Sequence, residues 1–456
     1  MLVALLGAAP AQDPPPLRER ALDMLHKTLR NQGAYRTLQG LVRHAPKRLA
    51  GSPGAAAAVE WARQQMTSIG LADVRLEEVV TNRWVRGTVC RVTALVGGAE
   101  IPLAATALGG SIGTPQGGLE ARVVEVKTFG KLRAIKETAR GAIILFNRPW
   151  DPTLRNAFTS YSRVVNQRSR GAIEASKAGG VAALVRSVTS MPDDVPHTGH
   201  MGYADDTAKV PAAAISVVAA DRLKVLLDRH GDALSVRIEM DCGMREPVRS
   251  ANVVGEIKGR ELPDEVVLIA AHLDAWDLAQ GAQDDGAGVA HCLEAMRLIK
   301  SSGRPPRRTV RVCLYMDEEN GLAGGLAYAA QHAGELAKHV LAIETDSGGA
   351  APHGFGVSGG KKMVTALEPV SALLSRYDLG KIVQGGGGAD ISPLGPSGVP
   401  LMSLRSADHR YFDVHHSAKD TIEQVHPREL SLGAGALAIC AFAVADSAGT
   451  LPRTNQ

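Results

Sequence analysis

Hydrophobic residues recur with two different periods in the N-terminal part of the chain. Apolar positions follow helical spacing over residues 17–45 and 55–69, which predicts amphipathic helices. The segments "DVRLEEVV" and "RVTALVG" come next and are rich in β-branched residues, which predicts strands. This part of the chain is therefore expected to combine helices with strands.

From residue 251 onward, apolar strands alternate with helices. Helices are expected from about residues 285, 361 and 427 and also between the second and third strands, and the four strands are "EVVLIAAH", "TVRVCLYM", "HVLAIET" and "VPLMSLRS". Strands that are apolar throughout and alternate with helices indicate a mainly parallel sheet with helices on both faces. The predicted fold class is α/β, with a mixed, mainly parallel sheet sandwiched by helices.

The sequence pattern of residues 111–244 differs from that of the flanking segments and predicts an inserted domain. This stretch begins near the glycine-rich "LGGSIGTPQGGLE" and contains short strands such as "GAIILFN" and a helix expected over "RGAIEASKAGGVAALVRS". The chain has 456 residues, which is too long for one ordinary hydrophobic core. We therefore expect residues 15–110 and 245–456 to form one domain and the insertion to form a second.

Composition and charge narrow the class of protein. The chain is 45% hydrophobic and 21% charged with a formal net charge of +4, which indicates a globular protein and gives no nucleic-acid surface. Residues 1–14 resemble a secretory signal, so the mature protein is expected to be secreted or periplasmic; an ordinary apolar N-terminus is the alternative. No other run approaches the roughly 18 uninterrupted apolar residues of a membrane span.

The five cysteines could be reduced or paired, and one glycine-rich segment could be a binding loop or a structural loop. The five cysteines form no CxxC pair, so they are expected to be reduced thiols, with a disulfide between Cys90 and Cys242 as the alternative. The segment "QGGGGADISP" lacks the Gly-Lys-Ser/Thr ending of a phosphate-binding loop and is interpreted as a structural loop.

Polar side chains cluster where the predicted strands end. They are His272 and Asp274 after the first strand, Asp317, Glu318 and Glu319 after the second, and Glu344 and Asp346 after the third. A further polar cluster, at residues 408–421, follows the last strand. Each residue alone would be a helix cap or an ordinary polar group, but carboxylates that converge at one sheet edge repel one another unless cations neutralise them. Carboxylates mixed with imidazoles favour zinc or a similar first-row ion.

Five sequence motifs resemble the motifs of a known enzyme family. "HLDAWD", "GAQDDGAG", "YMDEENGLAGG", "ETDSG" and "HHSAKDT" resemble, in order and spacing, the zinc exopeptidases that include bacterial aminopeptidases and glutamate carboxypeptidases. The resemblance covers about residues 250–425. It implies two Zn²⁺ per chain, and the implied ligands are His272 and Asp346 for the first ion, Glu319 and His416 for the second, and Asp284 as the bridge. It also implies a cis peptide between Asp284 and Asp285.

The resemblance also implies catalytic roles. Glu318 matches the general base that receives a proton from a metal-activated water, and Asp274 is expected to orient the imidazole of His272. In "VHHS" either histidine could bind metal; the family pattern selects His416, which makes His415 a candidate partner of the oxyanion.

The implied activity is hydrolysis of dipeptides or short peptides. The insertion resembles a protease-associated domain, which we expect to cover the catalytic crevice and limit substrate length. The segments "VPHTGHMGY" and "VPAAAISV" resemble one branch of the family, and this resemblance implies a secreted, dimeric dipeptidase. The partners implied are therefore a small peptide substrate and a second copy of the chain. Alternatives are an aminopeptidase acting on longer peptides, a glutaminyl cyclase with one zinc, and a catalytically silent binding module. His197 and His200 are expected to be surface residues, with a separate metal site as the alternative.

Overall fold

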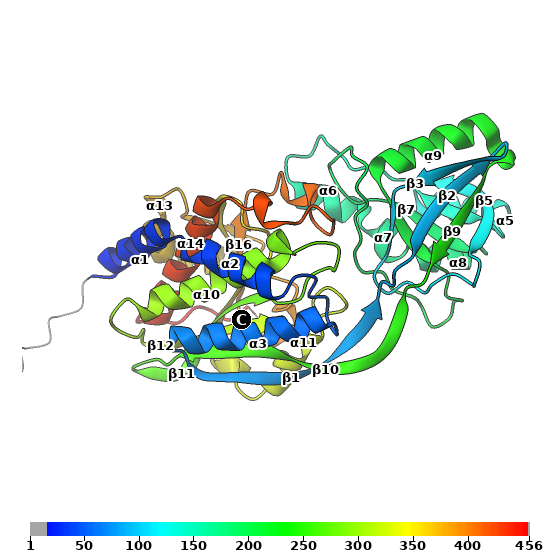
Figure 1. Cartoon of the computed structure of the whole chain (residues 1–456). Helices are drawn as coiled ribbons and strands as arrows, with labels where there is room; N and C mark the ends of the chain where they lie inside the picture. Colours follow the sequence, from blue (N-terminus) through cyan, green and yellow to red (C-terminus); the bar gives the residue numbers. More distant parts are fainter. Residues whose placement is uncertain (1–15, 455–456) are drawn as a thin grey trace, which may run out of the picture.

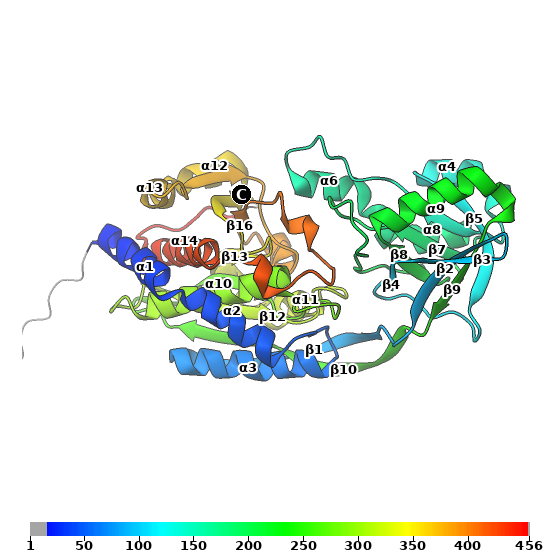
Figure 2. The same ribbon diagram turned by 45° about the horizontal axis from the view of Figure 1, so that its top comes forward.

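A computed structural model describes residues 16–454, which form two units, each built on an eight-stranded sheet (Figures 1 and 2). The larger unit contains residues 16–85 and 243–454, and the smaller unit contains residues 86–242. Strands β1 (Ala72–Val85) and β10 (Gly243–Ile257) pair antiparallel and extend from the larger unit towards the smaller one. The predicted signal segment, residues 1–14, lies outside the described residues.

The larger sheet confirms the mixed α/β fold. Its order is β1-β10-β12-β11-β13-β16-β14-β15. The four strands of its centre run parallel, whereas β10 and β14 are antiparallel to the strands beside them in this group. The remaining strands are β11 (Leu262–His272), β12 (Arg308–Tyr315), β13 (His339–Glu344), β14 (Pro352–Val357), β15 (Lys381–Gln384) and β16 (Leu401–Ser406). Strands β14 and β15 were not predicted, because they are short and "PHGFGV" has glycines that interrupt the apolar pattern.

Helices cover both faces of this sheet. They are α1 (Leu17–Asn31), α2 (Gly33–His44), α3 (Pro53–Ile69), α10 (Ala287–Lys300), α11 (Ala323–Gln331), α12 (Gly360–Ala366), α13 (Glu368–Ser375) and α14 (Pro427–Asp446). Val267 and Ile269 of β11 pack into the core that contains α10 and α14, whereas Leu268 and Ala270 pack with Tyr328 of α11. Because successive residues of a strand face opposite sides, a strand covered on both faces is apolar throughout.

Helix α14 is the one described helix that is long and apolar enough to cross a membrane. Arg428, Glu429 and Ser431 interrupt its apolar pattern, so no uninterrupted apolar run of this length was expected here. The mean hydropathy of its best window is 1.5, but 83% of that window is buried inside the protein, where α14 packs against α1 and α10. Its apolar character is therefore explained by burial in the core of the larger unit.

The smaller unit has the strand order β3-β2-β9-β5-β6-β7-β8-β4. Its strands are β2 (Cys90–Val96), β3 (Ala99–Leu103), β4 (Ala105–Ala107), β5 (Leu119–Val126), β6 (Ile143–Phe146), β7 (Ala182–Arg186), β8 (Ala212–Ile215) and β9 (Ser235–Met240). Its helices are α4 (Phe129–Ala134), α5 (Lys136–Ala139), α6 (Ala157–Val164), α7 (Asn166–Ser169), α8 (Gly171–Lys177) and α9 (Val217–His230).

Two details of the smaller unit differ from expectation. Its sheet already includes β2, β3 and β4, so the chain enters this unit after β1 and not at residue 111. The single helix expected over residues 170–187 is a helix followed by a strand: α8 ends before Gly179, whose φ is 79°, and β7 is a buried strand that pairs with β6 and β8. Periodicity alone does not separate a short apolar strand from a buried helical segment.

The units meet through α6 and the segment after β16. Phe158 and Tyr161 of α6 stack on Tyr411 and Phe412, and Ala157 and Trp150 join the same cluster. In both ribbon views α6 lies at the side of the smaller unit that faces the larger one. All five cysteines lie within the described residues and are free thiols, so the alternative disulfide between Cys90 and Cys242 is absent.

Candidate metal centre

The strand ends bring the predicted polar residues together at one edge of the larger sheet. Strand β11 ends at His272, β12 is followed by residues 317–319, and β13 is followed by Asp346. Asp284 lies between β11 and α10, and the peptide that joins it to Asp285 is cis, as expected.

One group of candidate ligands contains His272, Asp284 and Asp346. The Nε2 atom of His272 lies 3.2 Å from Oδ1 of Asp284 and 3.8 Å from Oδ1 of Asp346. The three residues come from separate turns of the chain, so the fold itself assembles this group.

The second group shares Asp284 with the first. The Nε2 atom of His416 lies 3.1 Å from Oδ2 of Asp284 and 3.1 Å from Oε2 of Glu319. His415 also approaches, with Nε2 3.5 Å from Oδ2 of Asp284, and its ring stacks on that of His416 at a centroid distance of 3.6 Å. Only His416 contacts both carboxylates, which favours it over His415 as the ligand.

These distances fit ligands arranged around ions. Donor atoms bound tetrahedrally at 2.0–2.1 Å lie about 3.3 Å from one another, and the closest contacts of the two groups are 3.1 and 3.2 Å. Oε1 of Glu319 is buried and accepts no hydrogen bond from the described residues, and the buried Oδ2 of Asp284 has only the imidazoles of His415 and His416 beside it. Buried carboxylate oxygens without a donor are costly, so these residues fit a bound cation.

The electrostatics of the cluster also fit cation binding. Burial opposes the charge of His416, but the charge of Glu319 and hydrogen bonding to Asp284 raise its pKa to about 9. Burial likewise opposes charge on Asp284, yet hydrogen bonds from His272 and His416 hold its pKa well below the usual range. The histidines of the cluster thus bind protons when no metal ion is present. Metal binding requires unprotonated imidazole, so an ion would take the place of these protons.

The position of Asp284 is fixed by Asp420 and Arg48. The carboxylate of Asp420 accepts from the backbone N–H of Gln283 at 2.6 Å and of Asp284 at 3.1 Å. Arg48 is fully buried and donates to three carbonyl oxygens between Leu273 and Gly281, at 2.6 to 2.8 Å. The sequence analysis did not single out Arg48, because nothing in its local sequence marks a buried arginine.

Asp274 supports the loop of residues 317–319 more directly than it supports His272. Its two carboxylate oxygens accept from the backbone N–H of Asp317 at 2.9 Å, of Glu318 at 3.1 Å and of Glu319 at 3.3 Å. The Nδ1 atom of His272 lies 3.1 Å from the backbone carbonyl oxygen of Asp274 and 3.8 Å from Oδ1 of its carboxylate. The imidazole is therefore oriented by the backbone of Asp274, and the side chain positions the two glutamates.

Glu344 faces the glycine-rich loop and not the candidate ligands. Its Oε2 atom accepts from the backbone N–H of Ile391 at 2.9 Å, and a Cβ at Gly388 would lie 2.1 Å from its carboxyl carbon. The segment "QGGGGADISP" therefore packs on Glu344, in agreement with its interpretation as a structural loop.

The smaller unit contributes contacts to the segment of His415 and His416. The backbone N–H of Thr198 donates to the carbonyl oxygen of His416 at 2.8 Å, and Nδ1–H of His197 donates to that of His415 at 2.6 Å. Arg168 is buried, and its Nη1 lies 3.4 Å from Nδ1 of His416. Sequence reasoning missed Arg168, because no local pattern shows which residues of one unit reach the other.

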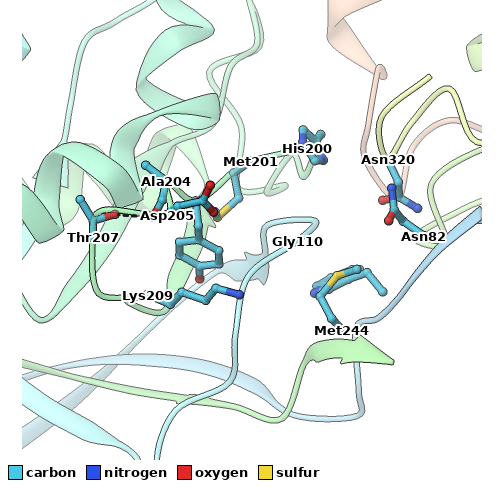
Figure 3. Close-up of a pocket in the computed structure, with 12 residues that line it drawn as sticks. Asn82, Gly110, His200, Met201, Ala204, Asp205, Thr207, Lys209, Met244 and Asn320 are labelled. Carbon is cyan, nitrogen blue, oxygen red and sulfur yellow. Dashed lines mark hydrogen bonds between the residues drawn. The ribbon is translucent and has the colours of Figure 1, made fainter. Parts of the chain in front are cut away.

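His197 and His200 do not form a metal group among the described residues. His197 is buried, which contradicts the expected surface position and is explained by its hydrogen bond to His415, whereas His200 is exposed. His200 borders a cavity of about 420 Å³ between the units. Figure 3 shows Asn320 of the larger unit on one side of this cavity and Lys209 of the smaller unit on the other.

Four of the candidate ligands, Asp284, Glu319, Asp346 and His416, line a crevice of about 430 Å³ beside α6. Arg168, Glu318 and Tyr161 face the same crevice. Burial raises the pKa of Glu318 well above its usual range. A larger cavity of about 1220 Å³ shares Phe158 and Asp346 with the crevice, so the two hollows adjoin.

Comparisons with known proteins agree with this arrangement. Residues 252–438 match peptidase family M28. Carboxypeptidase Q from Mus musculus is 37% identical over 421 residues, which are 92% of this chain and 87% of that protein. Carboxypeptidase Q from Homo sapiens is 35% identical with the same coverage.

Solved structures show the same relationship. The crystal structure of a peptidase M28 precursor from Shewanella amazonensis is 33% identical, with a TM-score of 0.91 over 96% of this chain and 98% of that chain. The aminopeptidase from Aneurinibacillus sp. strain AM-1 shares the fold, with 22% identity and a TM-score of 0.65 over 94% of this chain and 98% of that chain. Similarity over almost the whole length shows that the chain belongs to peptidase family M28.

Proposed function

We propose that the protein is a zinc-dependent exopeptidase that hydrolyses dipeptides or short peptides with two Zn²⁺ per chain. The observation that carries this proposal is the position of Asp284, whose two carboxylate oxygens face different histidines at 3.2 and 3.1 Å. A carboxylate shared in this way is suited to bridge two ions. The carboxypeptidases and the aminopeptidase to which the chain is similar support the exopeptidase class.

The ligand roles follow the two groups of side chains. His272 and Asp346 would hold the first ion and Glu319 and His416 the second, with Asp284 between them. When bound, the two ions would lower the pKa of a shared water and polarise the scissile carbonyl.

Glu318 is the proposed proton carrier. It faces the crevice, and its backbone N–H is held by Asp274, so its carboxylate is placed beside the ligands without being needed as one. It would take a proton from the attacking water and deliver it to the leaving amine, a step worth about 10² to 10⁴ in rate.

His415 is the proposed partner of the oxyanion. Burial and the neighbouring His416 lower the pKa of His415 well below its usual range, so it is neutral. Its Nε2 atom points towards Asp284, from where an N–H could donate to the developing oxyanion.

The charged ends of a small peptide find opposite charges in the crevice. Arg168 can pair with a carboxylate, and the acidic side chains beside the ligands can pair with an amino group. The smaller unit is proposed to be a protease-associated domain, and export and a homodimer stay proposals that rest on the family resemblance.

The proposed function is tested with purified protein treated with a chelator and then supplied with Zn²⁺. Unblocked short peptides should be cleaved only after zinc is restored. N-acetylation or C-terminal amidation of a dipeptide should each lower kcat/KM by at least about tenfold, because a buried charged group in the site is left unpaired. Zinc-independent cleavage, or equal cleavage of peptides blocked at both ends, would contradict a zinc exopeptidase.

A further inference from the structure

The largest cavity beside the candidate metal centre is a groove of about 1220 Å³. It lies between the residues that precede α6 and the strands β14, β15 and β16 of the larger sheet. Phe158 and Asp346 line both this groove and the crevice of the candidate ligands, so the two hollows adjoin at the first proposed ion site. Pockets for small ligands usually have about 300–1,000 Å³, so the groove has room for more than one amino-acid residue.

Three cations line this groove without acidic partners. Arg155 comes from the smaller unit, Lys381 from the edge strand β15 and Arg405 from β16. Within residues 16–454, none of the three forms an ion pair, and all three are exposed. Arg168, which lines the crevice, differs because it is buried and donates to the hydroxyl of Tyr161 at 2.8 Å.

His353 shows that these cations lie near one another. Burial lowers its pKa; the negative charge of Asp408 opposes this, and the positive charges of Arg405, Lys381 and Arg155 add to it. The four basic residues therefore surround one space.

The carboxylates on the walls of the groove do not neutralise this positive charge fully. Oδ2 of Asp408 accepts from the backbone N–H of Ala157 at 2.8 Å. Asp346 belongs to the candidate ligands, and Glu344 holds Ile391. Asp378 and Asp408 are the remaining carboxylates on the wall, so three unpaired cations face two carboxylates.

Unpaired cations around a concave surface create a positive potential, which attracts anions and steers them into the hollow. A peptide bound at the adjoining metal centre carries carboxylates in its acidic side chains and at its C-terminus. The groove begins where such a peptide would leave the crevice.

We propose that this groove binds a carboxylate of the peptide substrate that lies beyond the residues flanking the scissile bond. The carboxylate belongs either to an acidic side chain or to the C-terminus of a peptide longer than a dipeptide. This inference rests on the proposed function and names its substrate class: acidic short peptides, held by Arg155, Lys381 and Arg405.

The test uses the zinc-loaded full chain and a set of alanine-based pentapeptides. One pair carries Glu or Gln at the central position, and a second pair has a free or an amidated C-terminus. The groove variant is Arg155→Gln, Lys381→Gln and Arg405→Gln combined. The matched control replaces three exposed cations outside the groove, Arg43→Gln, Arg229→Gln and Lys362→Gln, so both proteins lose the same charge.

The measured quantity is the ratio of kcat/KM within each peptide pair, which does not depend on the fraction of folded enzyme. At low ionic strength we expect the wild type and the control to prefer the charged member of one pair by about five- to tenfold, since each exposed ion pair adds a modest amount. The groove variant should bring this ratio close to one. The pair that responds identifies the source of the carboxylate.

Binding gives a second readout that does not need turnover. A fluorescent Glu pentapeptide should bind Glu318→Gln protein more tightly than its Gln counterpart, and the difference should disappear in the groove variant and at high ionic strength. Ratios near one in the wild type, or ratios that the groove variant leaves unchanged, would overturn the proposal while cleavage of neutral peptides still supports the exopeptidase. Absence of any zinc-dependent cleavage would instead contradict the proposed function.

Discussion

The Nδ1 atom of His197 lies 2.6 Å from the carbonyl oxygen of His415. His197 belongs to the smaller unit, whereas His415 and the adjacent His416 belong to the larger one. Together with the bond from Thr198 to His416, this contact fixes the backbone that directs His416 towards Asp284 and Glu319. The smaller unit therefore supports the candidate metal centre in addition to bordering the crevice.

Replacing His197 with Ala should weaken the second ion site. The side chain of His197 restricts the segment of His415, and groups that orient ligands typically account for about 10- to 100-fold in metal affinity. We expect zinc titration of His197→Ala to show about tenfold weaker binding at one of two sites, with His26→Ala as an exposed control. A lower Tm with both zinc affinities unchanged would show that the contact supports folding only.

Glu318 and Glu319 should differ sharply when each is changed to Gln. Glu318→Gln should retain both ions and lose at least about 10² in kcat, because only proton transfer is removed. Glu319→Gln should lose affinity for the second ion, because it removes a charged ligand 3.1 Å from His416. Zinc content and kcat of the two variants provide the comparison, and the opposite pattern would exchange the two roles.

Asp274→Asn should impair both functions of the loop of residues 317–319. In the variant, one carboxylate oxygen is replaced by an amide donor that faces backbone N–H groups. The loop therefore loses an acceptor that holds the backbone of Glu318 and Glu319 in the wild type. We expect kcat to fall by about tenfold or more, together with weaker zinc binding. Asp264→Asn, an exposed change paired with Lys338, serves as the control and should leave both quantities unaltered. A loss of kcat with unchanged zinc affinity would limit the role of Asp274 to Glu318.

His339 should make stability depend on pH. Burial lowers the pKa of His339 to about 4, and the neutral ring donates from Nδ1 to the carbonyl of Glu335 and accepts at Nε2 from the hydroxyl of Tyr328. The unfolded chain binds this proton at a pKa of about 6.5, so the stability that neutral His339 provides is complete above about pH 6.5 and is lost as the pH falls towards 4. Denaturant unfolding should be measured for the wild type and His339→Gln at pH 7 and pH 5. The difference between their free energies of unfolding should be smaller at pH 5 by roughly 1–2 kcal/mol. A constant difference would show that folding does not shift the pKa of His339.

The larger unit was largely predictable from the sequence, because its signals are local. Strands covered on both faces are apolar throughout, and the residues just beyond them carry the candidate ligands, so His272, Glu319 and Asp346 could be expected near one another. Helices α10 and α14 begin within about two residues of the expected positions. The cis peptide after Asp284 followed from the resemblance and is present.

What depends on contacts between the units could not be predicted. Strands β2 to β4 look like any half-buried strands, and only their pairing shows that they belong to the smaller sheet. Arg168 and His197 reach the metal centre only when α6 packs on Tyr411 and Phe412. No local pattern reports such a contact between segments that are far apart in sequence.

The central claim, that Asp284 bridges two ions, is tested most directly by zinc stoichiometry. Metal-free protein is titrated with Zn²⁺ while bound zinc and peptide cleavage are measured on the same samples. We expect two equivalents to bind and activity to reach its maximum only as the second is filled, with Asp284→Asn weakening both sites. Full activity with one tightly bound ion, and no second equivalent at any zinc concentration tested, would contradict the bridging role of Asp284.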